Sequence, residues 1–367
     1  MKKTLKNIFL SSIRQNIGKT TVSLGLHSML KERNLNTAFM KPVGQRFVNV
    51  GNLQVDKDSY LLGEVFHCCK SIFKDMSPVT IARGYTEEYI AHPKKEHLQK
   101  SIEQAYAHLI DDKDAIIVEG TGHAGVGSVI DFSNADVARL LKSKVIIVSE
   151  GGIGRAIDEI MLNKALFDLK GVDVIGVIIN KVIPEKYEKI KKIVAQGLKN
   201  KGIELFGVIP MQPLLSSPTV DQICFELGLR FLCGEDNGSR HIGPPIVAAM
   251  EPYNTIHYFL PDALVITPGD RIDNILLAIS SHFVKDIEDY HISGIILTGG
   301  LVPNEKILHL LRKSKMPILV TEDDTYTVAA KIKSLTCKIQ KTDIDKIQEA
   351  ARLVKEYVDV DKILSLC

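Results

Sequence analysis

Short apolar runs alternate with amphipathic segments along the first two hundred residues of the chain. The runs are rich in Val and Ile, as is typical of strands buried on both faces of a sheet. They lie at residues 7–11, 37–40, 115–119, 145–149, 174–180 and 205–209. The segments with helical spacing lie at residues 21–30, 101–109, 135–141, 156–167 and 185–198. This alternation predicts an α/β fold, in which a parallel sheet has helices on both faces.

The pattern breaks at residues 210–218, where Pro and Ser are frequent and helical spacing is lost. We therefore expect a first domain over residues 1–213 and a second, smaller α/β domain over residues 218–335. Thr219 is suited to cap a helix over residues 220–227, which Gly228 ends. Strand-like runs follow at residues 263–267, 294–297 and 318–320, each before a helical segment, at 272–281, 305–313 and 325–332. Residues 336–367 form a C-terminal segment with one more predicted helix, over 343–357.

The three strand-like runs of the second domain end in polar or Gly-rich turns. These turns are PGDR at residues 268–271, TGG at 298–300 and TEDD at 321–324. Ligands of open α/β sheets bind at the carboxyl ends of strands, so the three turns could line one crevice. Ordinary turn and helix-cap chemistry explains the same residues equally well.

The composition argues against several classes of protein. Lys and Arg number 46 and Asp and Glu 44, with no basic cluster among aromatic residues, so we expect no nucleic-acid partner. The six cysteines are scattered and form no Cys-x-x-Cys pair, which favours a reduced, cytoplasmic protein without a zinc site. No apolar run approaches the roughly 18 residues that cross a bilayer, so we expect no membrane partner. The apolar N-terminal stretch is interrupted at Arg14 and Gln15, unlike a signal peptide.

The strongest chemical signal is the sequence SSIRQNIGKTT at residues 11–21, between the first predicted strand and the first helix. Backbone N–H groups of such a turn and of the helix N-terminus bind nucleotide phosphates. Lys19 would counter the terminal phosphate charge, and Thr20 would offer its hydroxyl to Mg²⁺. We predict that five residues bind the nucleotide: Asn16, Gly18, Lys19, Thr20 and Thr21. A chance Gly-Lys-Thr before a helix is the alternative, and the preceding strand argues against it.

The loop departs from the usual fingerprint in one position. A glycine normally lies six residues before the lysine, and here that position is Ile13. We expect Ser12, one residue earlier, to take the turn instead.

Charged residues follow other predicted strands at the same edge of the sheet. Glu119 ends the run 115–119, where a carboxylate can face Mg²⁺ or an attacking group. Lys41 follows the second strand and could bring another positive charge to the phosphates. For both residues, a solvated side chain is the alternative. Asp56 and Asp58 precede a helix that we expect to begin at Ser59; Mg²⁺ prefers such carboxylates, although helix capping accounts for at least one of them.

Together these motifs resemble those of dethiobiotin synthetase and its P-loop relatives, which include the cobyrinic acid amidation enzymes. The family's Gly-Thr-x-Thr-x-Val-Gly-Lys-Thr loop aligns with residues 12–20, its Lys-Pro-Val with residues 41–43 and its Val-Glu-Gly-x-Gly with residues 118–122. The resemblance implies that Lys41 meets phosphate or a carboxylated substrate, and that Asp58 and Glu119 complete the Mg²⁺ site with Thr20. It also implies that Asn180 reads the adenine base. We therefore expect ATP and Mg²⁺ as cofactors, and the catalytic groups would be Lys19, Lys41 and Glu119.

The resemblance is weakest in the loop that faces the substrate. The family's Gly-Thr-x-Thr reads Ser12-Ile13-Arg14-Gln15 here, which removes two hydroxyl groups that face the diamine in dethiobiotin synthetase. We therefore expect nucleotide binding rather than the synthesis of dethiobiotin.

The second domain resembles the DRTGG domain, through residues 269–271 and 298–300. The order of the two domains is similar to the N-terminal half of long phosphate acetyltransferases, over about residues 1–335. The large acetyltransferase domain of that family does not fit in the remaining residues, and we expect it to be absent.

The leading hypothesis is a cytoplasmic, Mg²⁺-dependent ATP-binding protein, an ATPase with a regulatory or oligomerising DRTGG domain. One alternative is an ATP-dependent ligase or synthetase that acts on a small carboxylate or amine. Another is a non-catalytic nucleotide sensor that controls a metabolic enzyme, such as an acetyltransferase. We also expect a homo-oligomer, because dethiobiotin synthetase-like domains pair to complete their substrate sites. The sequence leaves open whether the protein is an enzyme.

Overall fold

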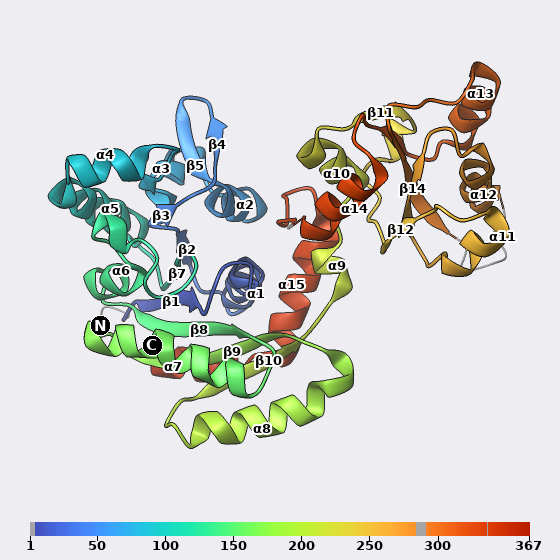
Figure 1. Ribbon diagram of the computed structural model, residues 1–367. Helices are drawn as coiled ribbons and strands as arrows, with labels where there is room; N and C mark the ends of the chain where they lie inside the picture. Colours follow the sequence, from blue (N-terminus) through green and yellow to red (C-terminus); the bar gives the residue numbers. More distant parts are fainter. Residues whose placement is uncertain (1–3, 284–290, 336) are drawn as a thin grey trace. The chain divides into compact units, whose positions relative to one another are not determined.

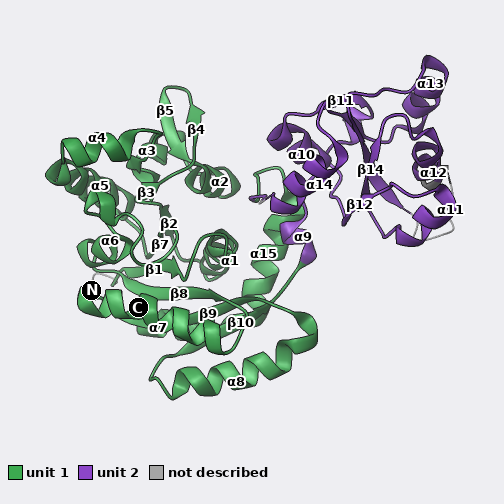
Figure 2. Cartoon of the chain, in the orientation of Figure 1, with its two compact units in different colours: residues 1–212, 339–367 green, residues 213–338 purple. Residues whose placement is uncertain are grey.

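The chain forms two compact units, shown in different colours in Figure 2. The computed structural model describes residues 4–283, 291–335 and 337–367. Unit 1 comprises Met1–Gln212 and Ile339–Cys367, and unit 2 comprises Pro213–Lys338. The chain therefore leaves unit 1 after its last strand, builds unit 2 and then returns to unit 1.

Six parallel strands form the sheet of unit 1, in the order β10-β9-β8-β1-β7-β2 (Figure 1). The strands are β1 Lys6–Ser12, β2 Thr37–Met40, β7 Ala115–Glu119, β8 Lys144–Glu150, β9 Val174–Val182 and β10 Leu205–Pro210. Each contains one of the six predicted runs. The side chains of β7 are fully buried and those of β8 nearly so, as expected for central strands covered on both faces. The predicted α/β fold with a parallel sheet is confirmed.

Helices cover both faces of this sheet (Figure 1). In the view of Figure 1, α7 and α8 lie on one side of the sheet, and α1 and α15 lie on the other. Helices α1 and α15 pack against each other, and α15 also contacts β10. The helices of the main layers are α1 Lys19–Glu32, α5 Lys95–Leu109, α6 Asn134–Leu140, α7 Gly154–Leu169, α8 Tyr187–Lys199, α15 Ile344–Tyr357 and α16 Val360–Leu366. Two single turns, η2 Ser128–Ile130 and η3 Pro184–Lys186, lie between them.

Short elements fill the chain between β2 and α5. They are β3 Val43–Gly44, β4 Phe47–Val50, β5 Leu53–Asp56, α2 Lys57–Val65, η1 Lys70–Ile72, α3 Phe73–Met76, β6 Val79–Thr80 and α4 Tyr85–Ala91. The expected helix start at Ser59 is wrong by two residues. Helix α2 begins at Lys57 because the carboxylate of Asp56 caps it, accepting the N–H of Asp58 at 2.8 Å.

Unit 2 is built on a five-stranded sheet in the order β11-β15-β14-β13-β12, parallel except for β11. The strands are β11 Arg230–Cys233, β12 Pro245–Val247, β13 Ala263–Pro268, β14 Ile292–Thr298 and β15 Ile318–Val320. The helices are α9 Pro213–Ser216, α10 Val220–Leu227, α11 Pro252–Thr255, α12 Ile272–Phe283, α13 Glu305–Ser314 and α14 Thr325–Ser334, with single turns η4 Glu235–Asn237 and η5 Ile256–Tyr258. As predicted, Thr219 caps α10 and Gly228 ends the helix, with a φ of 65°; Gln222 completes a capping box with Thr219.

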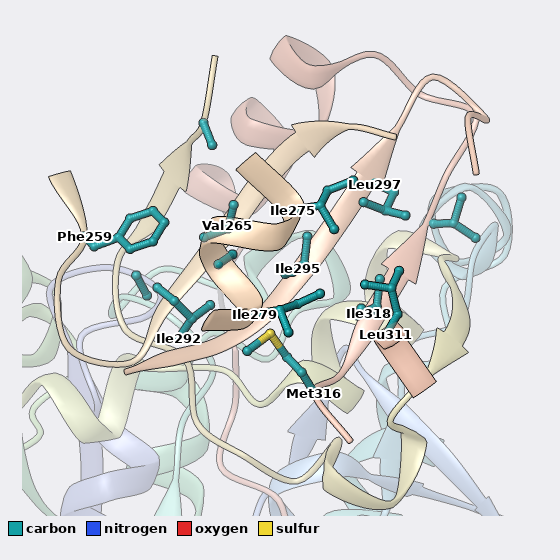
Figure 3. Close-up of a cluster of buried hydrophobic side chains, with 14 of the residues drawn as sticks. Phe259, Val265, Ile275, Ile279, Ile292, Ile295, Leu297, Leu311, Met316 and Ile318 are labelled. Atoms are coloured by element: carbon teal, nitrogen blue, oxygen red, sulfur yellow. The ribbon is translucent and has the colours of Figure 1, made fainter. Parts of the chain in front are cut away.

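Alternate residues of the β13, β14 and β15 strands enter two separate cores. The core in Figure 3 combines Val265 and Ile295 with side chains of α12 and α13, among them Ile275 and Leu311. The core on the other face places Ile296 and other strand residues against α10 and α14. Unit 2 is therefore a second, smaller α/β domain with its own hydrophobic cores, as predicted.

Candidate functional site

The turn between β1 and α1 has a left-handed backbone at two residues. Asn16 has a φ of 60°, and Gly18, directly before α1, has a φ of 96°. A Cβ atom on Gly18 would lie 2.3 Å from Nδ2 of Asn180, so both the backbone and the space require glycine there. Ile13 has no positive φ and its side chain is buried. No glycine is therefore needed at that position of the fingerprint.

Lys19 is buried beside Ser12, at the start of the loop, and Gly122, in the turn after β7. Its ammonium donates to the Ser12 hydroxyl at 2.8 Å and to the carbonyl of Gly122 at 3.4 Å. The hydroxyl of Ser12 in turn donates to backbone carbonyls, that of Gly122 among them at 3.0 Å. Ser12 therefore stabilises the turn through its hydroxyl, and its backbone stays outside the left-handed region.

Glu119, at the end of β7, is fixed by two hydroxyl groups of α1. The Thr20 hydroxyl donates to Oε1 at 3.1 Å, and the Ser23 hydroxyl donates to Oε2 at 2.7 Å. Glu119 is therefore no solvated strand-end residue, since only 1% of it is exposed. Ser23 was missed by the sequence reasoning, although it lies one helical turn after Lys19 and so shares its face.

Lys41 is likewise buried, between three carboxylates. Its ammonium forms an ion pair with Asp58 and lies 3.5 Å from both Oδ1 of Asp56 and Oε1 of Glu119. Burial by itself lowers the pKa of Lys41, but the three carboxylates, Asp58 foremost, raise that pKa above its usual value. Lys41 is therefore charged, and Asp56 both caps α2 and faces this ammonium.

The oxygen atoms around Lys41 are of the kind that Mg²⁺ prefers. Thr20, Asp58 and Glu119 offer a hydroxyl and two carboxylates, and Thr20 already contacts Glu119. The donor set therefore fits Mg²⁺ in its chemistry. In the described part of the chain, no group of three or more His, Cys, Asp or Glu side chains is arranged to hold a metal ion.

Asn180 and Thr21 both lie near Gly18: a Cβ atom on Gly18 would be 2.3 Å from Nδ2 of Asn180 and 3.9 Å from Oγ1 of Thr21. Asn180, in β9, donates its amide to the carbonyl of Ile17 at 2.8 Å, and its Oδ1 accepts the N–H of Lys181. The ammonium of Lys181 donates to the carbonyl of Asn16 at 2.7 Å. These bonds hold the loop against the end of β9. A role of Asn180 in reading adenine stays a prediction.

An ion pair between Arg14 and Glu150 also lies at this edge of the sheet and was missed by the sequence reasoning. Arg14 belongs to the loop, and Glu150 ends β8 as Glu119 ends β7. The same strand-end signal that singled out Glu119 was therefore present at Glu150.

In unit 2, the three polar turns lie at the ends of neighbouring parallel strands. Backbone bonds join them: the N–H of Gly299 donates to Asp323, and that of Gly300 to Thr321, both at 2.8 Å. Arg271 donates to the carbonyls of Ala249 and Met250 and pairs with Asp273. Asp324 caps α14. These groups therefore serve in turns and helix caps, and their role in binding a ligand stays a prediction.

The glycine turn at the end of β1, with Lys19 and Thr20 opening α1, defines unit 1 as a domain with a P-loop-type nucleotide-binding fold. Residues 6–219 match the family model described as an AAA domain, and the chain belongs to this family. Residues 222–335 match the model of the DRTGG domain. The predicted order of a P-loop domain followed by a DRTGG domain is confirmed.

Curated relatives that align with both domains of the chain are phosphate acetyltransferases. The chain is 28% identical over 368 residues to the enzyme of Nitratidesulfovibrio vulgaris, a match that covers 97% of this chain and 51% of the relative. It is 26% identical over 369 residues to the enzyme of Synechocystis, with 98% and 51% covered. The chain spans about half the length of the curated relatives it matches. It is related to the N-terminal part of these proteins.

Two solved structures are each similar to part of the chain. The MinC:MinD cell division protein complex of Aquifex aeolicus is 16% identical, with a TM-score of 0.37 over 57% of this chain and 83% of that chain. The CBS and DRTGG domains of the regulatory region of Clostridium perfringens pyrophosphatase are 17% identical, with a TM-score of 0.26 over 38% and 66%.

Within the described residues, none of the helices combines the length and the apolar character that crossing a bilayer requires.

Proposed function

We propose that this chain binds and hydrolyses ATP, with Mg²⁺, at the loop between β1 and α1, and that its DRTGG domain regulates this activity or mediates oligomerisation. The observation that carries the proposal is the left-handed Gly18 directly before buried Lys19, at the N-terminus of a 14-residue helix. Backbone N–H groups in this arrangement bind phosphate oxygens, and the ammonium of Lys19 neutralises their charge. The resemblance to dethiobiotin synthetase-like domains supports the same assignment.

The remaining residues of the site have separate roles in this proposal. Thr20, Asp58 and Glu119 would hold Mg²⁺, which when bound neutralises phosphate charge and orients the reacting groups. Lys41 would neutralise the charge that develops as the phosphoryl group is transferred to water. Asn16, Gly18 and Thr21 would shape the phosphate loop, and Asn180 would read the base.

The Lys19→Ala variant tests the nucleotide site. We expect ATP affinity in a calorimetric titration to fall by about 10- to 150-fold, because a charge-assisted contact to phosphate is lost. ATP turnover should fall to the background rate. The matched control is Lys144→Ala, which removes an exposed lysine that pairs with Asp173. Unchanged ATP affinity in Lys19→Ala would exclude this site.

A second candidate function is a non-catalytic nucleotide sensor that controls a metabolic enzyme. The observation that favours it over a synthetase is the side-chain chemistry of the loop. Ile13 is buried, and neither Ile13 nor Gln15, which stand where the synthetase family has Thr, offers a hydroxyl to a substrate. Slow basal turnover with a nucleotide-dependent change of assembly would support the sensor. Turnover that rises sharply with one small carboxylate or amine would support the ligase.

We also propose that the protein works in the cytoplasm and forms homo-oligomers. All six cysteines are free, which suits a reducing compartment. Light scattering with and without ATP would measure the oligomeric state. A single monomeric species under both conditions would contradict the proposed homo-oligomer.

A further inference from the structure

A lysine ammonium lies where the proposed metal ligands of this protein converge. The Lys41 ammonium contacts Asp58 and lies 3.5 Å from both Asp56 and Glu119. None of these four side chains is more than 6% exposed. Three carboxylates therefore face one ammonium in a region that is shielded from water, where charges interact strongly.

The ammonium and a divalent cation compete for the same oxygen atoms. Mg²⁺ binds carboxylate oxygens at about 2.1 Å. The oxygen atoms of Asp58 and Glu119 that would hold it are the ones that face Lys41. A Mg²⁺ ion on Oδ2 of Asp58 would therefore lie within about 5 Å of a full positive charge, with little water to screen the repulsion.

A nucleotide changes this balance, because its phosphates carry several negative charges. Lys41 follows β2, and Lys19 and Thr20 follow β1, so both segments lie at the carboxyl edge of one parallel sheet. A polyphosphate bound at this edge would attract the Lys41 ammonium away from the carboxylates and would leave their oxygens to the metal.

We propose that Lys41 is an internal counter-ion that keeps divalent cations out of this site until a nucleotide binds. This inference rests on the proposed function of the same site. In this proposal Lys41 is a positioning residue that controls when the metal binds. The metal binds together with the nucleotide and not before it. An ion pair with a purely structural role would stabilise the fold and would leave the order of binding unaffected.

The test measures Mn²⁺ binding to the full chain without nucleotide, by the loss of the free Mn²⁺ signal in electron paramagnetic resonance. Wild-type protein should bind Mn²⁺ no more tightly than its Asp58→Asn variant. Lys41→Met should bind Mn²⁺ at least about tenfold more tightly than wild type, because the competing charge is gone. Adding Asp58→Asn to Lys41→Met should abolish the gain. Lys144→Met, at an exposed ion pair, is the matched control and should behave as wild type.

Two results would overturn the proposal. In the first, wild-type protein binds Mn²⁺ without nucleotide, and the Asp58→Asn substitution weakens this binding. This measurement does not depend on whether Lys41→Met folds. The other is a folded Lys41→Met variant with wild-type Mn²⁺ affinity. The Lys19→Ala titration with ATP is a separate measurement. A gain of Mn²⁺ affinity in Lys41→Met with unchanged ATP affinity in Lys19→Ala would therefore refute the proposed nucleotide site and keep the role of Lys41 in excluding metal.

Discussion

His27 is a neutral histidine buried in α1, the helix that carries the proposed phosphate-binding residues. Only 2% of it is exposed, and its ring stacks on Phe66 with centroids 3.9 Å apart. Within the described part of the chain, its Nδ1 has no hydrogen-bond partner. Burial, helped by the charges of Lys31 and Lys113, lowers the pKa of His27 from 6.5 to about 3.

The stability of unit 1 should therefore depend on His27 below neutral pH. The unfolded chain takes up this proton near pH 6.5 and the folded chain only near pH 3, so stability is full above pH 6.5 and is lost as the pH falls towards 3. Between pH 7.5 and 5 the loss from this residue is about 2 kcal/mol. Urea denaturation of His27→Phe at both pH values should show a fall that is smaller by this amount.

Other groups titrate in both proteins and cancel in the comparison. The control is His97→Gln, at an exposed position of α5, which should keep the wild-type pH dependence. Equal losses in wild type and His27→Phe would show that the buried ring does not account for the pH effect.

At the scale of elements, Gly25 of α1 lies in close contact with α15. A Cβ atom there would lie 2.3 Å from a methyl group of Val354 and 2.6 Å from the carbonyl of Ala350. A glycine inside a helix costs about 1 kcal/mol relative to alanine. The contact with α15 therefore explains why glycine is found there.

Gly25→Ala should destabilise unit 1 by about 1–3 kcal/mol, because the added methyl group overpacks the contact between α1 and α15. The free energy lost by this overpacking exceeds the gain from the higher helix propensity of alanine. The measurement is the free energy of unfolding in denaturant. Gly154→Ala is the matched control: nothing lies within 4 Å of a Cβ atom at this first residue of α7, so it should be neutral or stabilising. A stabilised Gly25→Ala would contradict the close contact.

At the scale of the whole molecule, unit 1 is completed by the last residues of the chain. Leu353 and Val354 of α15 and Ile363 of α16 are fully buried. The N–H of Asp359 donates to the carbonyl of Phe206 in β10 at 2.8 Å. The C-terminal segment thus supplies part of the layer that covers the sheet, although about 125 residues of unit 2 separate it from β10 in the sequence.

Deletion of residues 339–367 should prevent unit 1 from folding stably. It removes five large buried side chains, Leu353, Val354, Val358, Val360 and Ile363. At about 1.5–3 kcal/mol each, their burial is comparable to the about 5–15 kcal/mol that stabilises a domain. Replacing residues 213–338 by a flexible Gly/Ser linker should leave unit 1 folded. Circular dichroism and limited proteolysis measure the folding of both variants. A deletion variant that unfolds cooperatively and resists proteolysis would contradict the expectation.

Much of this protein is determined locally in its sequence. The apolar runs of the strands and the helical spacing between them are short-range patterns, and each predicted run lies in an observed strand. Thr219 and Gly228 set the ends of α10 because caps involve residues only a few positions apart. The position of Lys19, Lys41 and Glu119 at one edge also followed from sequence, because carboxyl ends of parallel strands share an edge.

Only the tertiary structure decided what these groups contact. Two aspartates, Asp56 and Asp58, lie near the start of α2, and the helix begins at Lys57 because Asp56 caps it. Asp56 also faces Lys41. Lys41 is charged and buried because two segments of chain, the start of α2 and the end of β7, bring three carboxylates to it. Likewise, α15 covers the sheet because that is where Leu353 and its neighbours can be buried. Periodicity and caps are encoded within a few residues, whereas burial and ion pairing depend on which distant segments meet, and no local pattern specifies that.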